Sequence, residues 1–336
     1  MVLYDAHCHL SPFVKTETVA RLCENLNNIY GGHDSRDFNL MSTNKWDLEY
    51  VSEIASKTKV VMPCFGIHPW YSHLFTDKDY SSFSDPEEIK RVHYNNILTG
   101  SEVPQDLLDV LPVPEYFPKQ LERIREVVLK HSQFMIGEIG LDKLFRVPWT
   151  GYLGHDVKVS DKGTSFTKCY VKMTHQKYIF VELLLLAVEL NVPVSVHCVK
   201  AHGLLFDTVK EHCGDKIKIS LHSYSGSVDQ ANQWRKMFPN RVYFSLSKAI
   251  NLDGTRDPNS DDDKKYTKFH QIVDSMSKDT LLMETDMSLD TYYCGDEETT
   301  PNQLLHQSDL EVMQKALETR LGTDADLLAN WRRFLE

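Results

Sequence analysis

Eight short segments rich in apolar and β-branched residues alternate along the chain with longer amphipathic segments. Such alternation is typical of βα units, in which parallel strands form a sheet and the intervening helices cover it. A chain of 336 residues with eight such units fits one (β/α)₈ barrel, and we expect a single domain over residues 1–336. The expected strands lie near residues 2–9, 36–42, 59–66, 134–140, 192–198, 216–222, 241–247 and 279–286.

Between the expected strands, residues 175–190 have the clearest helical pattern, because apolar side chains recur there at every third or fourth position. The length of this segment suits an outer helix of a barrel. Polar stretches punctuated by Pro, Gly, Asp or Ser predict loop insertions at residues 71–118, 143–174 and 251–265. The acidic run at 261–263 is typical of a solvated loop.

The charge balance limits how the chain can bind a nucleic acid. Its 37 Lys and Arg residues against 48 Asp and Glu residues give a net charge of −11. This balance argues against a broad phosphate-binding surface, so any nucleic-acid substrate must be attracted locally. Bound divalent cations would provide such local positive charge.

Cysteine usage and hydropathy indicate the compartment. The seven cysteines form no C-x-x-C pair and are interpreted as reduced thiols. No apolar run reaches the length of a membrane span, and residues 1–10 lack the pattern of a signal peptide. We therefore expect a soluble protein of the cytoplasm, with the nucleus as a second location and no membrane contact.

Side chains that can carry chemistry recur along the expected strands. Asp5, His7 and His9 alternate along the first strand and therefore share one face, where two imidazoles can bind one metal ion. Cys8 points to the opposite face and packs against the helices. In the fourth strand Glu138 lies among apolar neighbours. A bound cation explains such a buried carboxylate, and a salt bridge to Lys or Arg is the alternative.

Two further histidines end the fifth and sixth strands. A single buried histidine is as consistent with a hydrogen-bonded core residue as with a metal ligand. His197 and His222, however, are expected at the same height on neighbouring strands, which favours a shared ion. Asp286 follows at the tip of the eighth strand, and catalytic groups of such barrels lie at the C-terminal ends of strands.

The expected metal site thus consists of nitrogen and oxygen ligands without a thiolate, a set that suits Zn²⁺, Mn²⁺ or Mg²⁺. There are enough ligands for two divalent ions that share a bridging carboxylate, and the identity of the metal stays open. The ligands are His7, His9, Glu138, His197, His222 and Asp286.

Six motifs follow one another along the chain: Asp5-Ala6-His7-Cys8-His9, Gly66-Ile67-His68-Pro69, Gly137 to Asp142, Pro193 to His197, His222 to Gly226, and Glu284-Thr285-Asp286. In this order they resemble the TatD-like metal-dependent deoxyribonucleases, and the resemblance covers almost the whole chain. It implies an amidohydrolase-like TIM barrel, divalent metal in the site and hydrolysis of phosphodiester bonds in DNA. It also points to a eukaryotic, fungal branch of the family.

The resemblance implies a division of the ligands between two ions. His7, His9 and Asp286 would hold one ion, His197 and His222 would hold the second, and Glu138 would bridge them.

The resemblance also implies that Asp286, Glu138 and His68 are the catalytic residues. Asp286 would accept the proton of a metal-bound water that attacks phosphorus. His68 would contact the substrate, whereas a His-Pro turn is the structural alternative. Asp142 would either orient a metal ligand or cap the following loop.

The residues that would face the substrate depart from the family pattern. Val199 and Lys200 stand where the family has an arginine and an acid, and residues 287–301 lack its Arg-Gly and Asn-Glu-Pro stretches.

The main hypothesis is a monomeric deoxyribonuclease acting on strand ends or single-stranded DNA. Two alternatives stay open. The same metals could hydrolyse an ester, lactone or amide, or a catalytically weak scaffold could bind a partner protein through residues 71–118.

Overall fold

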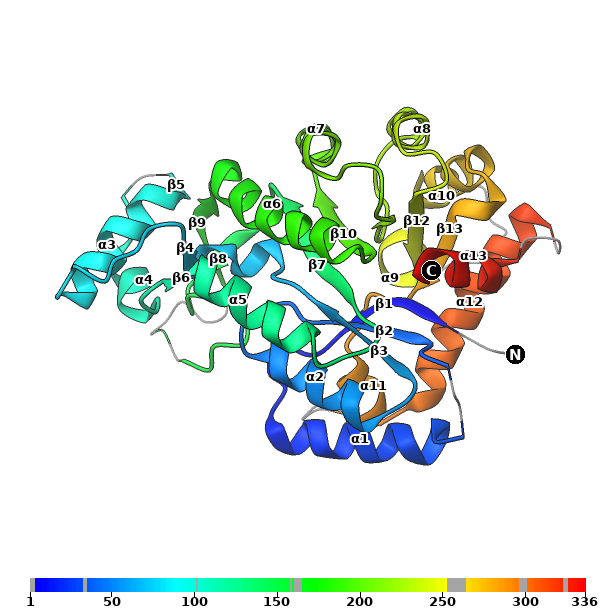
Figure 1. Ribbon diagram of the computed structural model, residues 1–336, viewed down its shortest axis with the longest axis horizontal. Coiled ribbons are helices and arrows are strands. Elements are labelled where there is room, and N and C mark those ends of the chain that lie inside the picture. Colours follow the sequence, from blue (N-terminus) through cyan, green and yellow to red (C-terminus); the bar gives the residue numbers. More distant parts are fainter. Residues whose placement is uncertain are drawn as a thin grey trace.

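The computed structural model describes residues 4–32, 35–100, 102–157, 159, 165–252, 264–295, 301–322 and 326–336. At its centre is an eight-stranded parallel barrel whose strands are neighbours in chain order (Figure 1). The predicted (β/α)₈ barrel is confirmed, and each barrel strand overlaps a predicted one. The strands are β1 (Asp5–His9), β2 (Phe38–Met41), β3 (Val61–Phe65), β7 (Met135–Asp142), β10 (Val194–Val199), β11 (Ile219–Leu221), β12 (Val242–Ser247) and β13 (Leu281–Glu284).

The barrel closes at a seam between its first and last strands. Just beyond the end of β13, the backbone N–H of Asp286 donates to the carbonyl oxygen of His7 at 2.9 Å. The backbone N–H of His9 in turn donates to the carbonyl oxygen of Met287 at 3.1 Å. The seam therefore joins segments from opposite ends of the chain, and both segments carry predicted metal ligands.

Amphipathic helices surround the barrel and bury their apolar faces against it. The predicted helix at 175–190 is confirmed as α6, which begins two residues earlier and ends at an Asn191 in the left-handed conformation. Of the helices that the structure describes, none is both long and apolar enough to cross a membrane. The outer helices are α1 (Thr16–Tyr30), α2 (Asp47–Lys57), α5 (Phe117–Val128), α6 (Met173–Leu190), α7 (His202–His212), α8 (Val228–Met237), α10 (Lys264–Ser275), α11 (Leu289–Cys294) and α12 (Gln303–Leu321), with the short α9 (Lys248–Asn251) after β12.

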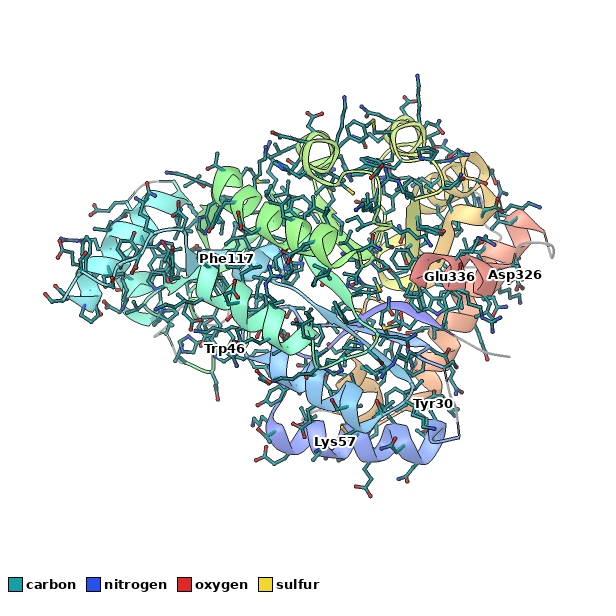
Figure 2. The ribbon with its side chains drawn as sticks, viewed as in Figure 1. Tyr30, Trp46, Lys57, Phe117, Asp326 and Glu336 are labelled. Carbon is teal, nitrogen blue, oxygen red and sulfur yellow. The ribbon has the colours of Figure 1, made fainter. Side chains whose placement is uncertain are left out.

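The last helix, α13 (Leu327–Leu335), covers the N-terminal ends of the strands. Its Trp331 stacks on Tyr4, with ring centroids 4.9 Å apart, and Asn330 Nδ2 donates to the Leu281 carbonyl at 2.9 Å where β13 begins. Figure 2 marks this helix by Asp326 and Glu336, on the opposite side of the molecule from Trp46. This helix thus packs across the N-terminal end of the barrel, whereas the predicted metal ligands lie at the C-terminal ends of the strands.

Two of the stretches predicted as polar loops contain regular structure instead. The chain after β3 forms a 3₁₀ turn η1 (Pro69–Leu74), two helices and three short strands before α5, and residues 143–174 add an antiparallel pair. The elements are β4 (Phe75–Thr76), α3 (Pro86–Ile97), β5 (Leu98–Thr99), α4 (Gln105–Val110), β6 (Glu115–Tyr116), β8 (Arg146–Pro148) and β9 (Phe166–Val171).

These two stretches pack on each other around a second hydrophobic cluster (Figure 1, cyan and green). Tyr94, Leu107 and Val147 are completely buried in it, and β5 pairs with β9. The prediction of polar loops was wrong because each stretch holds few apolar side chains, which form a core only when two distant stretches combine. Residues 253–263, including the acidic run at 261–263, lie outside the described residues.

Gly140 allows β7 and β10 to approach closely beside the site. Its φ is +153°, and a Cβ added there would lie 2.0 Å from the carbonyl oxygen of His197. We expect Gly140→Ala to displace the strand that carries His197 and to cost about 3 kcal/mol or more of stability. Thermal unfolding checks this.

Gly203 gives the matched control for this substitution. It lies in the first turn of α7, and a Cβ there would meet nothing within 4 Å. Gly203→Ala should therefore leave the unfolding temperature unchanged or raise it, because alanine favours the helix. Equal unfolding temperatures for the wild type and Gly140→Ala would contradict the close approach.

Candidate metal centre

A buried carboxylate surrounded by imidazoles lies at the C-terminal ends of the barrel strands. Glu138 Oε1 is 2.9 Å from His222 Nε2, 3.1 Å from His197 Nδ1 and 3.2 Å from His68 Nε2. Glu138 Oε2 is 3.3 Å from His7 Nε2. We call these five residues the Glu138 cluster. Among the described residues, no Lys or Arg pairs with Glu138, so the salt-bridge alternative has no partner in the structure.

Several polar atoms in and beside this cluster lack hydrogen-bond partners within the described part of the chain. They are His7 Nε2, His197 Nε2, His222 Nδ1 and Glu284 Oε2, all buried. An unsatisfied buried polar group costs roughly 1–3 kcal/mol, so their clustering requires an explanation. Imidazole nitrogens and carboxylate oxygens are ligands of divalent transition ions, and the donor set therefore fits a bound cation.

The ligand atoms fall into two groups whose members lie within 4.8 Å of one another. One group contains His7, His222 and Glu284, and the other contains His68, Glu138 and His197. The structure thus brings together four of the six predicted ligands, His7, Glu138, His197 and His222.

The other two predicted ligands, His9 and Asp286, lie at the rim outside these groups. Asp286 Oδ1 is 4.0 Å from His7 Nε2, and its Oδ2 accepts a hydrogen bond from Ser223 Oγ at 3.0 Å. His9 Nδ1 is 3.1 Å from the carbonyl oxygen of Leu10. A proton on Nδ1 that is donated to this carbonyl leaves Nε2 of His9 with a lone pair for a metal.

His68 belongs to the second of these groups, and its hydrogen bonding makes the neutral ring a donor at Nε2. The Trp70 backbone N–H donates to His68 Nδ1 at 3.1 Å, so the proton of a neutral ring lies on Nε2, which faces Glu138. Burial lowers the pKa of His68 to about 4, although Glu138 opposes this, so the ring is neutral at physiological pH. An N–H at this position suits contact with a substrate oxygen. The His-Pro turn is present too, since η1 begins at Pro69.

Asp142 caps the loop after β7, one of the two alternatives that the sequence left open, and its other oxygen faces His197. Its Oδ1 accepts from the backbone N–H groups of Leu144 at 2.7 Å and Phe145 at 3.0 Å, which caps the loop. Its Oδ2 accepts from Trp70 Nε1 at 2.7 Å and lies 3.5 Å from His197 Nε2. One carboxylate therefore fixes the loop after β7 and faces a predicted ligand.

The electrostatics of the cluster favour cation binding. Burial raises the pKa of Glu138, but the surrounding imidazoles outweigh burial and hold this pKa well below its ordinary range. Burial lowers the pKa of His222, but Glu138 more than reverses this and raises it well above its ordinary value. Burial also lowers the pKa of His197, and the nearby carboxylates of Asp142 and Glu138 raise it again, with a net increase. The carboxylate is therefore ionised and draws positive charge to itself.

Glu284 belongs to the motif Glu284-Thr285-Asp286, but no role was predicted for it from the sequence. Glu284 is completely buried at the end of β13, where its Oε1 accepts from the backbone N of Ser223 at 2.6 Å and from Ser223 Oγ at 2.8 Å. The same carboxylate lies 3.5 Å from His222 Nδ1. The signal was available, because Glu284 ends an apolar strand just as Glu138 lies within one. Such a carboxylate needs a partner.

Asp5 was predicted to share a face with His7. In the structure its side chain accepts hydrogen bonds at the seam between β1 and β13. It is completely buried, and it accepts from the Thr285 backbone N at 3.0 Å, from Thr285 Oγ1 at 2.6 Å and from His306 Nε2 at 2.9 Å. The pairing register of β1 shifts between Asp5 and Cys8, so simple alternation does not hold there.

Cys198 lies on the helix-facing side of β10, as strand alternation predicts, and lines a small cavity together with Leu205 and Trp234. Burial raises the pKa of its thiol to about 12. Because a neutral thiol is a poor metal ligand, we expect Cys198→Ser to keep its metal and most of its hydrolysis. Metal analysis and turnover of the purified variant check this. Loss of metal would mean that the side chain faces the barrel interior.

Three residues at the ends of barrel strands adopt the left-handed backbone conformation, which is uncommon outside glycine. They are Lys200 after β10 with φ +54°, Ser223 after β11 with φ +40° and Asp286 after β13 with φ +58°. Such residues concentrate at functional sites, where surrounding contacts hold them in place. Their position agrees with a site built at this end of the barrel.

Comparison with known sequences identifies relatives over most of the chain. The family described as "TatD related DNase" matches residues 4–323. An "Uncharacterized deoxyribonuclease" of Saccharomyces cerevisiae is 34% identical over 297 residues, which are 86% of this chain and 84% of that protein. The "Cut9-interacting protein scn1" of Schizosaccharomyces pombe is 31% identical over 315 residues, which are 84% of this chain and 86% of that protein.

Solved structures share the fold. A TatD homologue from Escherichia coli has a TM-score of 0.56 at 18% identity, with 99% of this chain and 97% of that chain covered. A TatD-family hydrolase from Entamoeba histolytica has a TM-score of 0.53 at 13% identity, with 99% of this chain and 96% of that chain covered. The predicted resemblance to fungal members is confirmed by the two yeast relatives. The chain therefore belongs to the TatD-related DNase family of metal-dependent hydrolases.

Proposed function

We propose that this protein is a divalent-metal-dependent deoxyribonuclease that cleaves phosphodiester bonds at strand ends or in single-stranded DNA. The observation that supports this most directly is the Glu138 cluster, in which an ionised, buried carboxylate lies 2.9–3.3 Å from four imidazoles. Membership of a DNase family supports DNA as the substrate.

Two divalent ions are the proposed stoichiometry. The family resemblance assigns His197 and His222 to one ion and His7, His9 and Asp286 to the other, with Glu138 as the bridge. The geometry favours another division, because His222 groups with His7 and Glu284, whereas His197 groups with His68 and Glu138, so Glu284 is a further candidate ligand. A bound divalent cation lowers the pKa of a water ligand and stabilises charge on phosphoryl oxygens.

Asp286 is the proposed proton acceptor. Its side chain is 15% exposed, against 5% for Glu138, so water reaches it from solvent. Ser223 Oγ holds one of its oxygens at 3.0 Å, which leaves the other free to receive the proton. His68 Nε2 lies 3.2 Å from Glu138 Oε1, and we propose that its N–H donates to a substrate oxygen beside this carboxylate.

A second candidate function, binding of a partner protein, is supported by the name of the Schizosaccharomyces pombe relative. We propose the insertion at 71–118 as its surface, because this segment extends beyond the barrel on the side away from α13 (Figure 1). A monomeric protein of the cytoplasm, with a nuclear fraction, fits both candidates.

Metal removal tests the proposed function. We expect the purified protein to contain divalent metal and to hydrolyse a single-stranded oligodeoxynucleotide. A chelator should abolish this activity, and adding back Zn²⁺, Mn²⁺ or Mg²⁺ should restore it. A panel of small phosphodiesters, carboxylic esters, lactones and amides serves as the comparison. Full metal content without phosphodiester hydrolysis would contradict the proposal. Hydrolysis of an ester, lactone or amide would then favour that substrate class, and no hydrolysis of any compound in the panel would favour partner binding.

A further inference from the structure

An open cavity of about 430 Å³ lies beside the Glu138 cluster, where β7 and β10 end and α7 begins. Its lining includes Lys143, Lys200, His202, Gly203 and Gln230, and it contains no carboxylate. We call it the lysine cavity. In a chain with 48 acidic and 37 basic residues, a cavity lined by cationic groups without an acid is a local reversal of the overall charge.

The two lysines of this cavity are exposed and have no ion-pair partner among the residues that the structure describes. Other lysines of the same chain are paired, as Lys177 with Glu211 at 3.5 Å and Lys90 with Glu87 at 3.1 Å. Lys143 and Lys200 therefore keep their ammonium groups available for an anion from outside.

Both lysines are tied to metal-site residues by short stretches of backbone. Lys143 directly follows Asp142, which lies 3.5 Å from His197 Nε2, and its own backbone N–H donates to the Val199 carbonyl at 3.0 Å. Lys200 lies three residues after His197, a stretch that spans at most about 10 Å. A DNA strand carries a phosphate for about every 3.4 Å of helix axis, so the lysines can reach phosphates next to the one at the metals.

The first turn of α7 lines the same cavity and adds positive potential. No side chain caps the first backbone N–H groups of this helix, because its N-cap residue is Ala201. Gly203 leaves open space above the turn. Burial lowers the pKa of the neighbouring His202, and Lys268 and Lys200 lower it further, which reflects the same positive field.

We propose that Lys143 and Lys200 bind backbone phosphates of the DNA strand beside the scissile phosphodiester, and so position it at the metal centre. This inference rests on the proposed deoxyribonuclease function. It gives the chain a cationic contact although Val199 occupies the place of the family's arginine. Because the net charge of −11 repels DNA at long range, contacts close to the metals must hold the strand.

The test compares a polymeric and a small substrate in the Lys143→Ala/Lys200→Ala variant. For a fluorescent oligodeoxythymidylate we expect KM to rise about tenfold or more, since charge-assisted hydrogen bonds are lost, with kcat nearly unchanged. For bis(para-nitrophenyl) phosphate, which has no neighbouring phosphates, both constants should stay as in the wild type.

Binding of the oligonucleotide as a function of salt gives a second readout. Each lost phosphate contact should reduce the slope of log affinity against log salt by about 0.7, so the double variant should lose about 1.4. The matched control is Lys130→Ala/Lys216→Ala, which removes the same charge just before β7 and β11, at the opposite end of the barrel. The control should change neither KM nor slope.

The outcomes separate this inference from the function on which it rests. An unchanged oligonucleotide KM and salt slope in the Lys143→Ala/Lys200→Ala variant would overturn the inference and leave the deoxyribonuclease in place. An equal loss with the small diester would also overturn it, because the metal centre itself would then be damaged. Wild-type protein that hydrolyses neither substrate contradicts the proposed function. In that case fluorescence anisotropy tests whether the two lysines bind the strand. Oligonucleotide binding by the double variant that equals wild-type binding would overturn the inference too.

Discussion

Replacing Glu138 with Ala is expected to remove the bound metal and abolish hydrolysis while the barrel stays folded. Both oxygens of this carboxylate face imidazoles, so its loss deprives each proposed ion of the ligand that they share. The effect should exceed the roughly 10- to 100-fold loss that follows when merely the partner of a metal ligand is removed. Metal content, thermal unfolding and turnover, measured on one preparation, check this expectation.

A purely structural role for Glu138 makes the opposite prediction. The unfolding temperature would fall, but metal content per folded molecule would not. Glu53→Ala is the matched control, because Glu53 lies on the exposed side of α2 and pairs there with Lys57 at 2.6 Å. This control should leave metal and turnover unchanged. Full metal content in folded Glu138→Ala protein would rule out the bridging role.

Asp286→Asn is expected to keep substantial metal and to bind substrate, while kcat falls roughly 10²-fold or more, the usual scale for losing a positioned general base. The amide has nearly the shape of the carboxylate, and it can still accept from Ser223 Oγ, which now lies 3.0 Å from Oδ2. It cannot accept the proton of the attacking water at neutral pH. Single-turnover rates, metal content and thermal unfolding on the same preparation check this.

Asp290→Asn provides the control for that substitution. Asp290 lies four residues further on and accepts from the Ser11 backbone N–H at 2.7 Å, outside the Glu138 cluster. Its amide variant should turn over normally. If Asp286→Asn also turned over normally, the proton acceptor would have to be sought elsewhere. A loss of stability without a loss of turnover per folded molecule would show that Asp286 merely holds the loop after β13.

The barrel and the centre of its site were predictable because both depend on local periodicity. A strand has a side-chain period of two, so a histidine in a known strand is assigned to a face without knowledge of the fold. His197 and His222 on adjacent strands follow directly from this reasoning. The pairing of Val196 with Leu221 sets them side by side, with His197 Nδ1 3.0 Å from His222 Nε2.

The features that could not be predicted depend on contacts between distant segments of the chain, which the local periodicity of the sequence does not encode. Asp5 lies at the seam, where its partner His306 is 301 residues away, and the register of β1 against β2 shifts just after it. The second hydrophobic cluster likewise combines Tyr94 with Cys169, from stretches that look polar separately. Glu284 also had no role predicted from the sequence, because Asp286 in the same motif accounts for the expected chemistry at the strand end.

The seam has a consequence for the order of events during synthesis. His7 and His9 leave the ribosome long before the segment that pairs with them, at Asp286 and Met287, has been synthesised. A nascent or stalled chain can therefore form helices and most strands without assembling its metal centre. The ligand group that combines His7 with Glu284 is completed only when the last barrel strand has been made, which places full metal binding after the synthesis of β13.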